Sequence, residues 1–298
     1  MSPNMTTTKD IAGAVVLYNP DAEVLNCIAS YRNQVAKLYA VDNSDTPPAF
    51  RDTLIQTPNI EYVSLNGNYG ISKALNVAAE KALAEGYSFL LCMDQDSTAS
   101  PDMVPTLLAE GPQDRADLGI LSPFHSIAVQ VAPPPGEPVC QEVLTVWTSG
   151  SLLNLNAYKQ VGPFKEDYFI DFVDHEYCMR LNLAGYRIYK INTAVLKHNI
   201  GTDIQKKKLL WLELIASNHS PLRRYYITRN RLRLASEMGK WFPAFFWDDK
   251  KKMVAEVLAI LFFEKERLKK ISMMLQGVWD YTRNVKGKYA RQCRKQVS

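Results

Sequence analysis

Short apolar runs alternate with helix-like segments up to about Leu121, and this alternation constrains the fold more than any other feature of the sequence. The runs are almost continuously apolar, as in strands buried on both faces, and occupy residues 13–18, 37–41, 60–65 and 88–93. Helices are expected between them, from Pro20 to about Arg32 and over residues 71–85, where Gly86 suits a C-terminal cap. The alternation predicts an α/β fold whose mostly parallel central sheet carries helices on both faces.

The rest of the chain divides into an irregular middle and a helical C-terminal part. In the middle, a helix is expected over residues 174–184, and strands over residues 143–147, 151–154 and 186–191. Beyond Pro221 the pattern is almost entirely helical, over residues 222–238, 250–263 and 268–284. The sequence therefore predicts two domains, an α/β domain over residues 1–215 and a C-terminal helical extension over residues 216–298.

Charge is distributed unevenly between these parts. The chain has 35 basic and 31 acidic residues, but residues 1–196 carry 12 basic and 22 acidic side chains while residues 197–298 carry 23 and 9. A basic C-terminal part is typical of proteins that face phosphates, a membrane surface or nucleic acid. No nucleic-acid recognition module accompanies it, so a nucleic-acid partner is not expected.

Cysteine usage and hydropathy favour a cytoplasmic protein. The 5 cysteines are scattered without a CxxC pair, as in reduced proteins. Residues 1–10 show neither the basic nor the apolar region of a signal peptide. The longest apolar stretch, residues 253–263, has about half the length needed to span a bilayer.

Polar side chains follow each of the apolar runs. They form the groups Tyr18-Asn19, Asp42-Asn43-Ser44, residues 66–70 and Asp94-Gln95-Asp96. Each group alone is typical of a turn. Ligands, however, bind at the carboxyl ends of parallel strands, which is where all these groups are expected to meet.

Asp94 and Asp96 are the sharpest candidates among them. Two carboxylates one residue apart leave a strand end on the same side, close enough to share Mg²⁺ or Mn²⁺ with water and substrate phosphate. The alternative is a turn in which Asp96 or Ser97 caps a helix ahead of Pro101.

Further candidates lie in the second half of the chain. Asp174 falls at the start of a predicted helix and is either an N-cap or a general base at the mouth of a cleft. His198 follows a predicted strand and is either structural or a third metal or phosphate ligand. Arg223 and Arg229 lie among tyrosines near a helix N-terminus, which suits a diphosphate. No P-loop or dinucleotide-binding glycine motif is present.

Short motifs occur in an order that resembles a known family. They are VVLYNP (15–20), VDNS (41–44), NGNYGISKALN (66–76), LLCMDQDS (90–97), TSGSLLNL (148–155), FIDFVDHEYCMRLNLAGYRI (169–188), LKHNIG (196–201) and RRYYITRN (223–230). The set resembles the inverting family-2 glycosyltransferases of the GT-A fold, and within them the bacterial rhamnosyltransferases that use dTDP-L-rhamnose. The resemblance covers about residues 11–235.

The resemblance implies a donor site and a metal site. Residues expected to line the nucleotide and diphosphate are Tyr18, Asn19, Asp42, Asn68, Gly70 and Lys73, with Asp42 at the thymine edge, and Arg229 would join them. Asp94 would face the ribose or the donor sugar. Asp96 and His198 would bind Mg²⁺ or Mn²⁺ on the diphosphate.

The resemblance also implies a catalytic base. Asp174 would take the proton of the acceptor hydroxyl as it attacks the anomeric carbon, and a single displacement would convert dTDP-β-L-rhamnose into an α-L-rhamnoside. The sequence departs from the family at Val173, where a glutamate is usual, and carries Asp171 and Glu176 nearby instead.

The expected acceptor is an oligosaccharide or a saccharide carried on a polyprenyl diphosphate. Residues expected to face it are Trp147, Thr148, Ser149 and Asp171. The reaction would serve the synthesis of a cell-surface polysaccharide, such as O-antigen or a cell-wall polymer, at the inner face of the cell membrane. Residues 240–298, with 14 basic and 6 acidic side chains, would then bind anionic lipid or form a homodimer contact.

Other readings remain open at this level. The same fold could use another donor, such as a UDP-hexose. A nucleotidyltransferase would need a glycine-rich basic loop after the first strand, which VVLYNPDAEV lacks. A non-catalytic scaffold of polysaccharide assembly would be expected to have lost one of Asp94, Asp96 and Asp174, all of which are present.

Overall fold

The structure, a computed structural model, describes residues 7–112, 116–127, 130–198, 205–209 and 212–289. The chain forms two compact units: unit 1 comprises Met1–Phe169 and Val173–Asn199, and unit 2 comprises Ile170–Phe172 and Ile200–Ser298. The predicted domain boundary at residue 215 lies inside the last strand of unit 2. The chain thus enters unit 2 for three residues, returns to unit 1, and leaves it again near residue 200.

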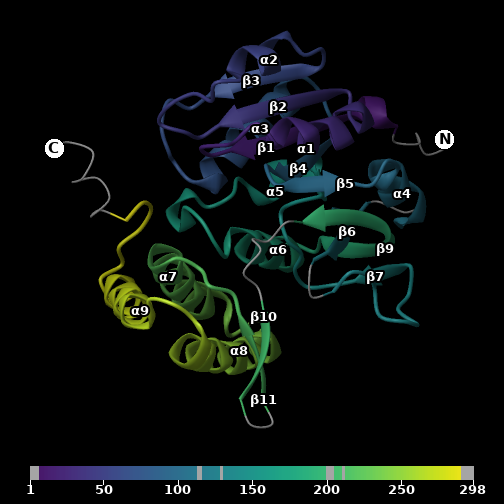
Figure 1. Cartoon of the computed structure of the whole chain (residues 1–298). Coiled ribbons are helices and arrows are strands. Elements are labelled where there is room, and N and C mark those ends of the chain that lie inside the picture. Colours follow the sequence, from purple (N-terminus) through teal and green to yellow (C-terminus); the bar gives the residue numbers. More distant parts are fainter. Residues whose placement is uncertain (1–6, 113–115, 128–129, 199–204, 210–211, 290–298) are drawn as a thin grey trace. The chain divides into compact units, whose positions relative to one another are not determined.

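Parallel strands form the first half of the sheet of unit 1, as predicted. They are β1 (Ile11–Leu17), β2 (Lys37–Asp42), β3 (Ile60–Ser64) and β4 (Phe89–Asp94), in the order β3-β2-β1-β4 (Figure 1). Helices α1 (Val24–Tyr31), α2 (Arg51–Gln56) and α3 (Ile71–Ala84) connect them. The register pairs Leu17 with Asp42 and Val16 with Asp94, so the polar groups that follow these strands lie along one edge.

The second half of the sheet is mixed. β8 (Ser151–Asn154) lies antiparallel to β4, and beyond it come β6 (Leu118–Ser126), β9 (Arg187–His198) and β5 (Ser97–Ala99), with β7 (Cys140–Glu142) beside β9. Helices α4 (Met103–Glu110), α5 (Leu155–Val161) and α6 (Val173–Leu183) belong to this half. Short 3₁₀ turns occupy η1 (Thr8–Asp10), η2 (Arg32–Gln34) and η3 (Glu166–Tyr168).

The strand predicted over residues 143–147 is wrong. Pairing with β9 stops at the bond from Val143 N to Ile188 O, and the following residues form a loop. Side chains of α6 satisfy its carbonyls instead: Asn182 Nδ2 donates to Leu144 O at 3.2 Å, and the Cys178 thiol lies 4.0 Å from Val146 O. The apolar run 143–147 therefore packs on a helix rather than in the sheet.

Apolar packing fixes the sheet of unit 1. Val15 and Leu17 of β1 share a buried cluster with Val24 and Ile28 of α1, which also includes residues of α4 and β9. Helix α3 is buried through its alanines and Leu75, and it packs on β1 and β2. The alternation of side chains along each buried strand supplies apolar groups to both faces.

Unit 2 contains a hairpin and long helices. The hairpin pairs β10 (Gln205–Leu209) with β11 (Leu212–Ala216), and the helices are α7 (Pro221–Met238), α8 (Pro243–Phe263) and α9 (Arg267–Thr282). Helix α8 begins seven residues before its predicted start, because Pro243 suits the first position of a helix. Residues 243–249, which lie between two predicted helices, therefore belong to its first turns.

Close packing joins α7 to α9. A Cβ on Gly277 of α9 would lie 2.7 Å from Tyr225 O of α7, so only glycine allows this approach. Tyr225 also donates to Asp280 Oδ2 of α9 at 2.7 Å. Among the described residues, no helix combines the length and the hydropathy that crossing a bilayer requires.

Candidate active site

Side chains following β1, β2 and β3 form one hydrogen-bonded edge. Ser44 Oγ accepts from Asn19 N at 2.8 Å, which joins the first two predicted groups. Asn43 donates to Asn68 Oδ1 at 3.2 Å and accepts from Tyr69 N at 2.8 Å. The structure thus brings Asn19 and Asn68 together as expected for neighbouring strand ends.

Asp42 lies beneath this edge rather than on its surface. Its side chain is fully buried, and its carboxylate oxygens accept from Ser44 N at 2.9 Å and from the Tyr62 hydroxyl. Burial raises the pKa of Tyr62, and its bond to Asp42 adds to the shift, so the phenol stays a donor. Asp42 therefore shapes the loop that carries Asn43 and Ser44.

The N-terminus of α3 makes a close contact with the segment that precedes Asp174. Ile71 N donates to Phe169 O at 2.8 Å. Gly70 has φ +89°, and a Cβ there would lie 2.5 Å from the same Phe169 oxygen. Lys73, one turn further on, forms a half-exposed ion pair with Glu166 at 3.3 Å. Gly70 is thus required both by its backbone conformation and by space.

The two carboxylates at the end of β4 belong to a loop fixed to Tyr18. Gln95 Oε1 accepts from Tyr18 N at 2.7 Å, and Gln95 Nε2 donates to Tyr18 O at 3.3 Å. Asp94 is half-buried and Asp96 is exposed. Gln95, for which the sequence suggested no role of its own, therefore ties the predicted nucleotide edge to the predicted metal loop.

Ser149 supports the same loop from behind. Its hydroxyl is buried, accepts from Asp94 N at 3.1 Å and donates to Ser97 Oγ at 2.8 Å. The carbonyl of Ser149 lies 2.7 Å from His125 Nε2, and the His125 ring meets the edge of Trp147 at 4.9 Å. The hydroxyl that was expected at the acceptor is thus engaged with the carboxylate loop.

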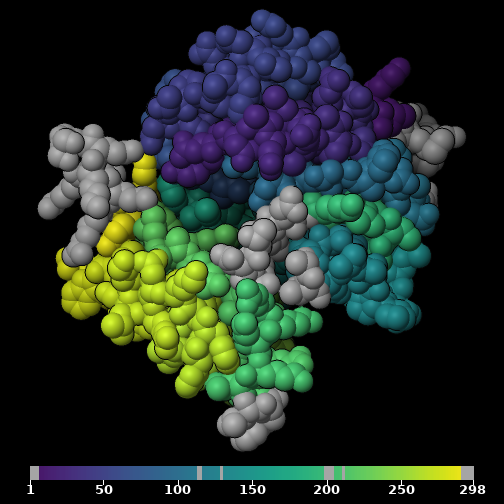
Figure 2. Space-filling model, in the orientation of Figure 1, coloured from purple at the N-terminus to yellow at the C-terminus, as the bar shows by residue number. Residues whose placement is uncertain are grey.

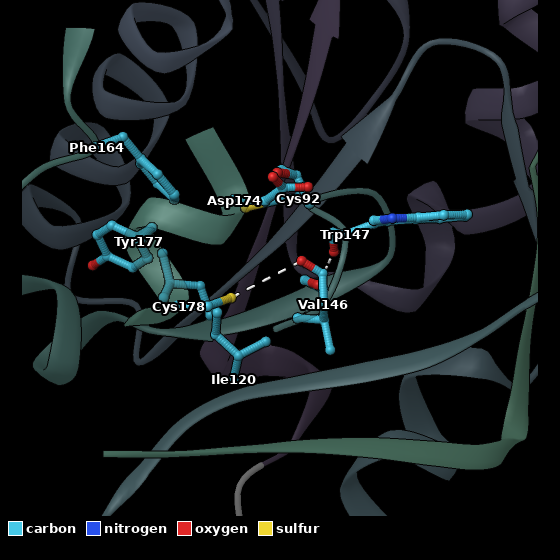
Figure 3. Close-up of a pocket in the computed structure, with 11 residues that line it drawn as sticks. Cys92, Ile120, Val146, Trp147, Phe164, Asp174, Tyr177 and Cys178 are labelled. Carbon is cyan, nitrogen blue, oxygen red and sulfur yellow. Dashed lines mark hydrogen bonds between the residues drawn. The ribbon is translucent and has the colours of Figure 1, made fainter. Parts of the chain in front are cut away.

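Asp174 lies at a small pocket of unit 1 (Figure 3). The pocket encloses about 20 Å³, about the space of one or two water molecules, and its walls are mostly apolar. Cys92, Trp147, Thr148, Phe164 and Tyr177 are among its lining residues. The predicted base and two predicted acceptor residues therefore share one cavity.

The charge of Asp174 is stabilised by its neighbour His175. Oδ1 of Asp174 lies 2.8 Å from His175 Nδ1 and accepts from His175 N at 2.8 Å. Burial opposes the charged form of the Asp174 carboxylate, but the His175 ring and the backbone amides outweigh burial and lower its pKa. Asp174 is therefore an ionised hydrogen-bond acceptor at neutral pH.

The two other acids near Asp174 are held by cations. Glu176 is fully buried, with Oε1 2.7 Å from Arg180 Nε and 3.1 Å from Lys165 Nζ. Asp171 lies 3.1 Å from the Arg223 guanidinium. The resemblance implies Asp174 as the base, and of these three acids Asp174 is the one that lines the pocket.

Arg229 and His198 are the remaining predicted ligand-binding residues. Arg229 is fully buried in unit 2, lies against the rings of Tyr225 and Tyr226, and donates to Gly287 O at 2.8 Å. Its guanidinium is thus engaged inside unit 2, and its donor contact stays a prediction. His198 ends β9 opposite Ser97, but its side chain is outside the described residues.

The carboxylates of the β4 loop fit a cation shared with a substrate. No group of three or more His, Cys, Asp or Glu side chains that could hold a metal occurs within the described ranges. Asp94 and Asp96 instead supply hard oxygen donors at an exposed strand end. Mg²⁺ is typically bound by one or two carboxylates, with water and substrate phosphate completing its shell.

Comparisons with known proteins agree with this fold. The family model for glycosyl transferase family 2 matches residues 14–172. The dTDP-rhamnosyl transferase RfbF of Shigella flexneri is 26% identical over 243 residues, which cover 76% of this chain and 79% of RfbF.

Solved structures share the fold at low sequence identity. GalNAc-T7, crystallised with UDP, GalNAc and Mn²⁺, matches with a TM-score of 0.61 and 12% identity over 82% of this chain, which spans 50% of that chain. TarS 1–349 of S. aureus, in complex with UDP-GlcNAc, matches with a TM-score of 0.56 and 15% identity over 92% of this chain and 81% of that one.

The fold is that of the GT-A class of glycosyltransferases. The chain belongs to glycosyl transferase family 2, because the family model covers more than half of its length.

Proposed function

We propose that this protein is an inverting glycosyltransferase that transfers L-rhamnose from dTDP-β-L-rhamnose to a saccharide hydroxyl. The observation that carries the proposal is Asp174, an ionised carboxylate at a pocket with Trp147, in a family-2 chain. The choice of rhamnose is supported by the 26% identity to a protein named dTDP-rhamnosyl transferase.

In this proposal the ends of β1 and β2 and the N-terminus of α3 bind the donor. Tyr18 and Asn19 border the nucleoside, and Asn68, Gly70 and Lys73 line the diphosphate. Asp42 acts on the base pocket by holding the loop of Asn43 and Ser44, since its own carboxylate is buried.

Asp174 is proposed as the base. Its carboxylate accepts the proton of the acceptor hydroxyl while that oxygen attacks the anomeric carbon from the face opposite the diphosphate. His175 holds the carboxylate in place through the bond to Oδ1. One displacement inverts the anomeric centre, so a β-linked donor gives an α-linked product.

Asp94 and Asp96, with His198, are proposed to hold Mg²⁺ or Mn²⁺. The cation supplies charge stabilisation to the leaving diphosphate. Gln95 and Ser149 keep the two carboxylates at the strand end through their bonds to Tyr18 and to Asp94 N. Ser149 is in this view a positioning residue rather than an acceptor contact.

The acceptor is proposed to be an oligosaccharide or a polyprenyl-diphosphate-linked saccharide of a cell-surface polysaccharide. Trp147 and Thr148 would contact the sugar that carries the reacting hydroxyl, because they share the pocket with Asp174. Asp171 would lie at the same approach, three residues before the base. The protein would act in the cytoplasm, at the inner face of the membrane.

Unit 2 supports the membrane part of this proposal. An open groove between the end of α8 and α9 is lined by Leu261, Leu268, Ile271, Ser272, Leu275, Gln276 and Trp279. The surface of these helices, yellow-green in Figure 2, also exposes the cationic residues Lys265, Arg267, Lys269 and Arg283. Apolar side chains flanked by cations are typical of helices that lie on anionic lipid. A homodimer through the same groove is the competing arrangement.

Donor screening tests the proposed function. The purified chain would be titrated with dTDP and UDP by calorimetry, with and without Mn²⁺, and incubated with dTDP-rhamnose, dTDP-glucose and UDP-GlcNAc. Tighter binding of dTDP and an α-linked rhamnoside by NMR support the proposal. Preferred use of UDP-GlcNAc, which TarS 1–349 was crystallised with, would replace the rhamnose assignment.

A further inference from the structure

The backbone just before Asp174 has an unusual conformation. Phe169, Asp171 and Phe172 have φ values of +65°, +61° and +63°. Left-handed φ is disfavoured for residues with a Cβ, and least tolerated by bulky side chains such as phenylalanine. A segment of this kind persists only where surrounding groups hold it.

The groups that hold it come from two different elements. Phe169 is fixed by unit 1, through Ile71 N and the close approach of Gly70. Residues 170–172 belong to unit 2 and are fixed by α7. The chain passes from unit 1 into unit 2 and back between Phe169 and Val173, just before Asp174.

Asn230 of α7 makes the central contact. Its side chain is fully buried, and Nδ2 donates to Ile170 O at 2.7 Å and to Asp171 O at 3.0 Å. Arg229 Nε donates to Asn230 Oδ1 at 3.0 Å and thereby orients the amide. Both amide hydrogens of Asn230 are therefore used on the backbone of the left-handed segment.

Two arginines of the same helix hold the side chains of that segment. Arg223 donates through Nε to Asp171 Oδ1 at 3.1 Å. The Arg231 guanidinium lies over the Phe172 ring, 5.4 Å from its centre. The side chains of Asp171 and Phe172 are thus held by an ion pair and by a ring contact from α7.

We propose that Asn230 is a positioning residue for the base, and that Arg223 assists it. The inference rests on the proposed role of Asp174. Val173 starts α6 and Asp174 is its second residue, so the conformation at 170–172 sets where the first turn of α6 begins. A change at Asn230 therefore moves the Asp174 carboxylate without touching the residues proposed to bind the donor.

Asn230→Asp is the decisive variant. It keeps the size of the side chain and the oxygen that accepts from Arg229, but replaces both amide hydrogens with an oxygen facing two carbonyls. We expect kcat to fall at least tenfold, with the dTDP dissociation constant unchanged within twofold. We also expect the acid limb of the kcat profile to move, because the surroundings of Asp174 change.

Hydrogen exchange provides a readout that does not depend on turnover. Amides of residues 169–176 should exchange faster in Asn230→Asp, while those of β1 and α3 keep their protection. The matched control is Arg233→Ala on the same helix, which removes the bond to Val285 O at 2.9 Å. Arg233→Ala should lower the melting temperature of unit 2 and leave kcat and exchange of residues 169–176 unchanged.

Several results would overturn the inference. Unchanged kcat and unchanged exchange in Asn230→Asp would show that the Asn230 amide does not position Asp174. Parallel loss of kcat, dTDP affinity and folded fraction would show a purely structural role. If Asp174→Asn retained turnover, the base assignment would fail and the positioning role with it, whereas faster exchange at 169–176 would still establish the mechanical hold of Asn230.

Discussion

Unit 1 and unit 2 bury different kinds of polar group. In unit 1 the buried polar side chains are mainly neutral, including Gln34, Asn43, Ser72, Asn76, Ser97, Ser149 and Asn154, with Asp42 and Glu176 as the charged exceptions. In unit 2 they are mainly charged: Arg224, Arg229, Arg231, Arg233, Asp249, Glu264, Lys270 and Asp280. Unit 1 thus buries few charged side chains, whereas unit 2 buries many.

The difference follows from how the backbone N–H and C=O groups of each unit find their hydrogen-bond partners. In unit 1 the sheet ladder pairs the backbone, so charged groups can stay at the strand ends where a ligand binds. In unit 2 the backbone groups pair within each helix. Ion pairs such as Arg224 with Glu264 at 2.9 Å then specify how the helices pack. These cations also affect His219, because burial, together with Arg223 and Arg224, lowers its pKa to about 4.

The largest effect on activity is expected from a substitution of Asp174 in unit 1. Asp174→Asn removes the proposed proton acceptor while keeping its shape, so kcat should fall by roughly 10²–10⁴. The dTDP dissociation constant by calorimetry should stay within about twofold. Turnover close to that of the unchanged protein would remove Asp174 as the base.

The next effect is expected in the core of unit 2. Glu264→Gln leaves the buried Lys270 without its carboxylate and Arg224 with Glu256 alone, and should cost about 3–5 kcal/mol of unfolding free energy. Urea denaturation measures it. The control Glu266→Gln breaks only an exposed pair with Lys269 and should leave the midpoint unchanged. Equal shifts in the two variants would contradict the contrast between the units.

A glycine pair in unit 1 separates backbone strain from steric contact. Gly70→Ala adds a Cβ 2.5 Å from Phe169 O at φ +89° and should cost roughly 2–4 kcal/mol, from left-handed strain plus overpacking. Gly86→Ala has a similar φ of +83° but no atom within 4 Å, so about 1–2 kcal/mol is expected. Thermal unfolding of both gives the difference, and equal losses would show that the contact with Phe169 is unimportant.

A surface substitution tests the membrane role of unit 2. Leu268 on α9 is 86% exposed, and burying a leucine is worth roughly 1.5–3 kcal/mol, so Leu268→Gln should weaken binding to anionic vesicles about tenfold. Val131→Gln, at a position of unit 1 that is 72% exposed, is the control and should change nothing. Unchanged partitioning of Leu268→Gln, with a concentration-dependent dimer by ultracentrifugation, would favour the dimer.

The smallest effect is expected on the pH dependence of kcat when His175 is replaced. The pKa of Asp174 is lowered because the His175 contacts outweigh burial, so these contacts contribute stability above the unfolded pKa and lose it as pH falls through the folded one. His175→Gln removes the ring contact and should move the acid limb of kcat to higher pH. A limb that stays in place would show that the backbone amides alone set the charge of Asp174.

The sequence predicted the residues at the strand ends better than the residues that hold them in place. The strand ends that carry Asn19, Asp42 and Asp94 were predicted because apolar runs and polar endings are local patterns. Gln95 and Ser149 escaped prediction as supports, since their partners are 77 and 55 residues away. Their roles depend on how β1, β4 and β8 are aligned, which no local pattern encodes.

The same limit applies to Arg229 and to residues 143–147. Arg229 shares a motif with tyrosines, which suits a diphosphate equally well as a buried cation against two rings. The run 143–147 has the composition of a strand, but the side chains of α6 bind its carbonyls. The distant partners are Gly287, 58 residues from Arg229, and Cys178 and Asn182, 32 and 38 residues from the carbonyls that they bind.

The sequence by itself determined the alternation of strands and helices, the family, and the acids at the strand ends, because each is written in residues that are neighbours along the chain. Only the tertiary structure decided which of three nearby acids is left to line a pocket, and how the segment before it is held. Arg180 engages Glu176 one turn away within α6, whereas Arg223 engages Asp171 from 52 residues away, a contact that exists only once α7 has packed.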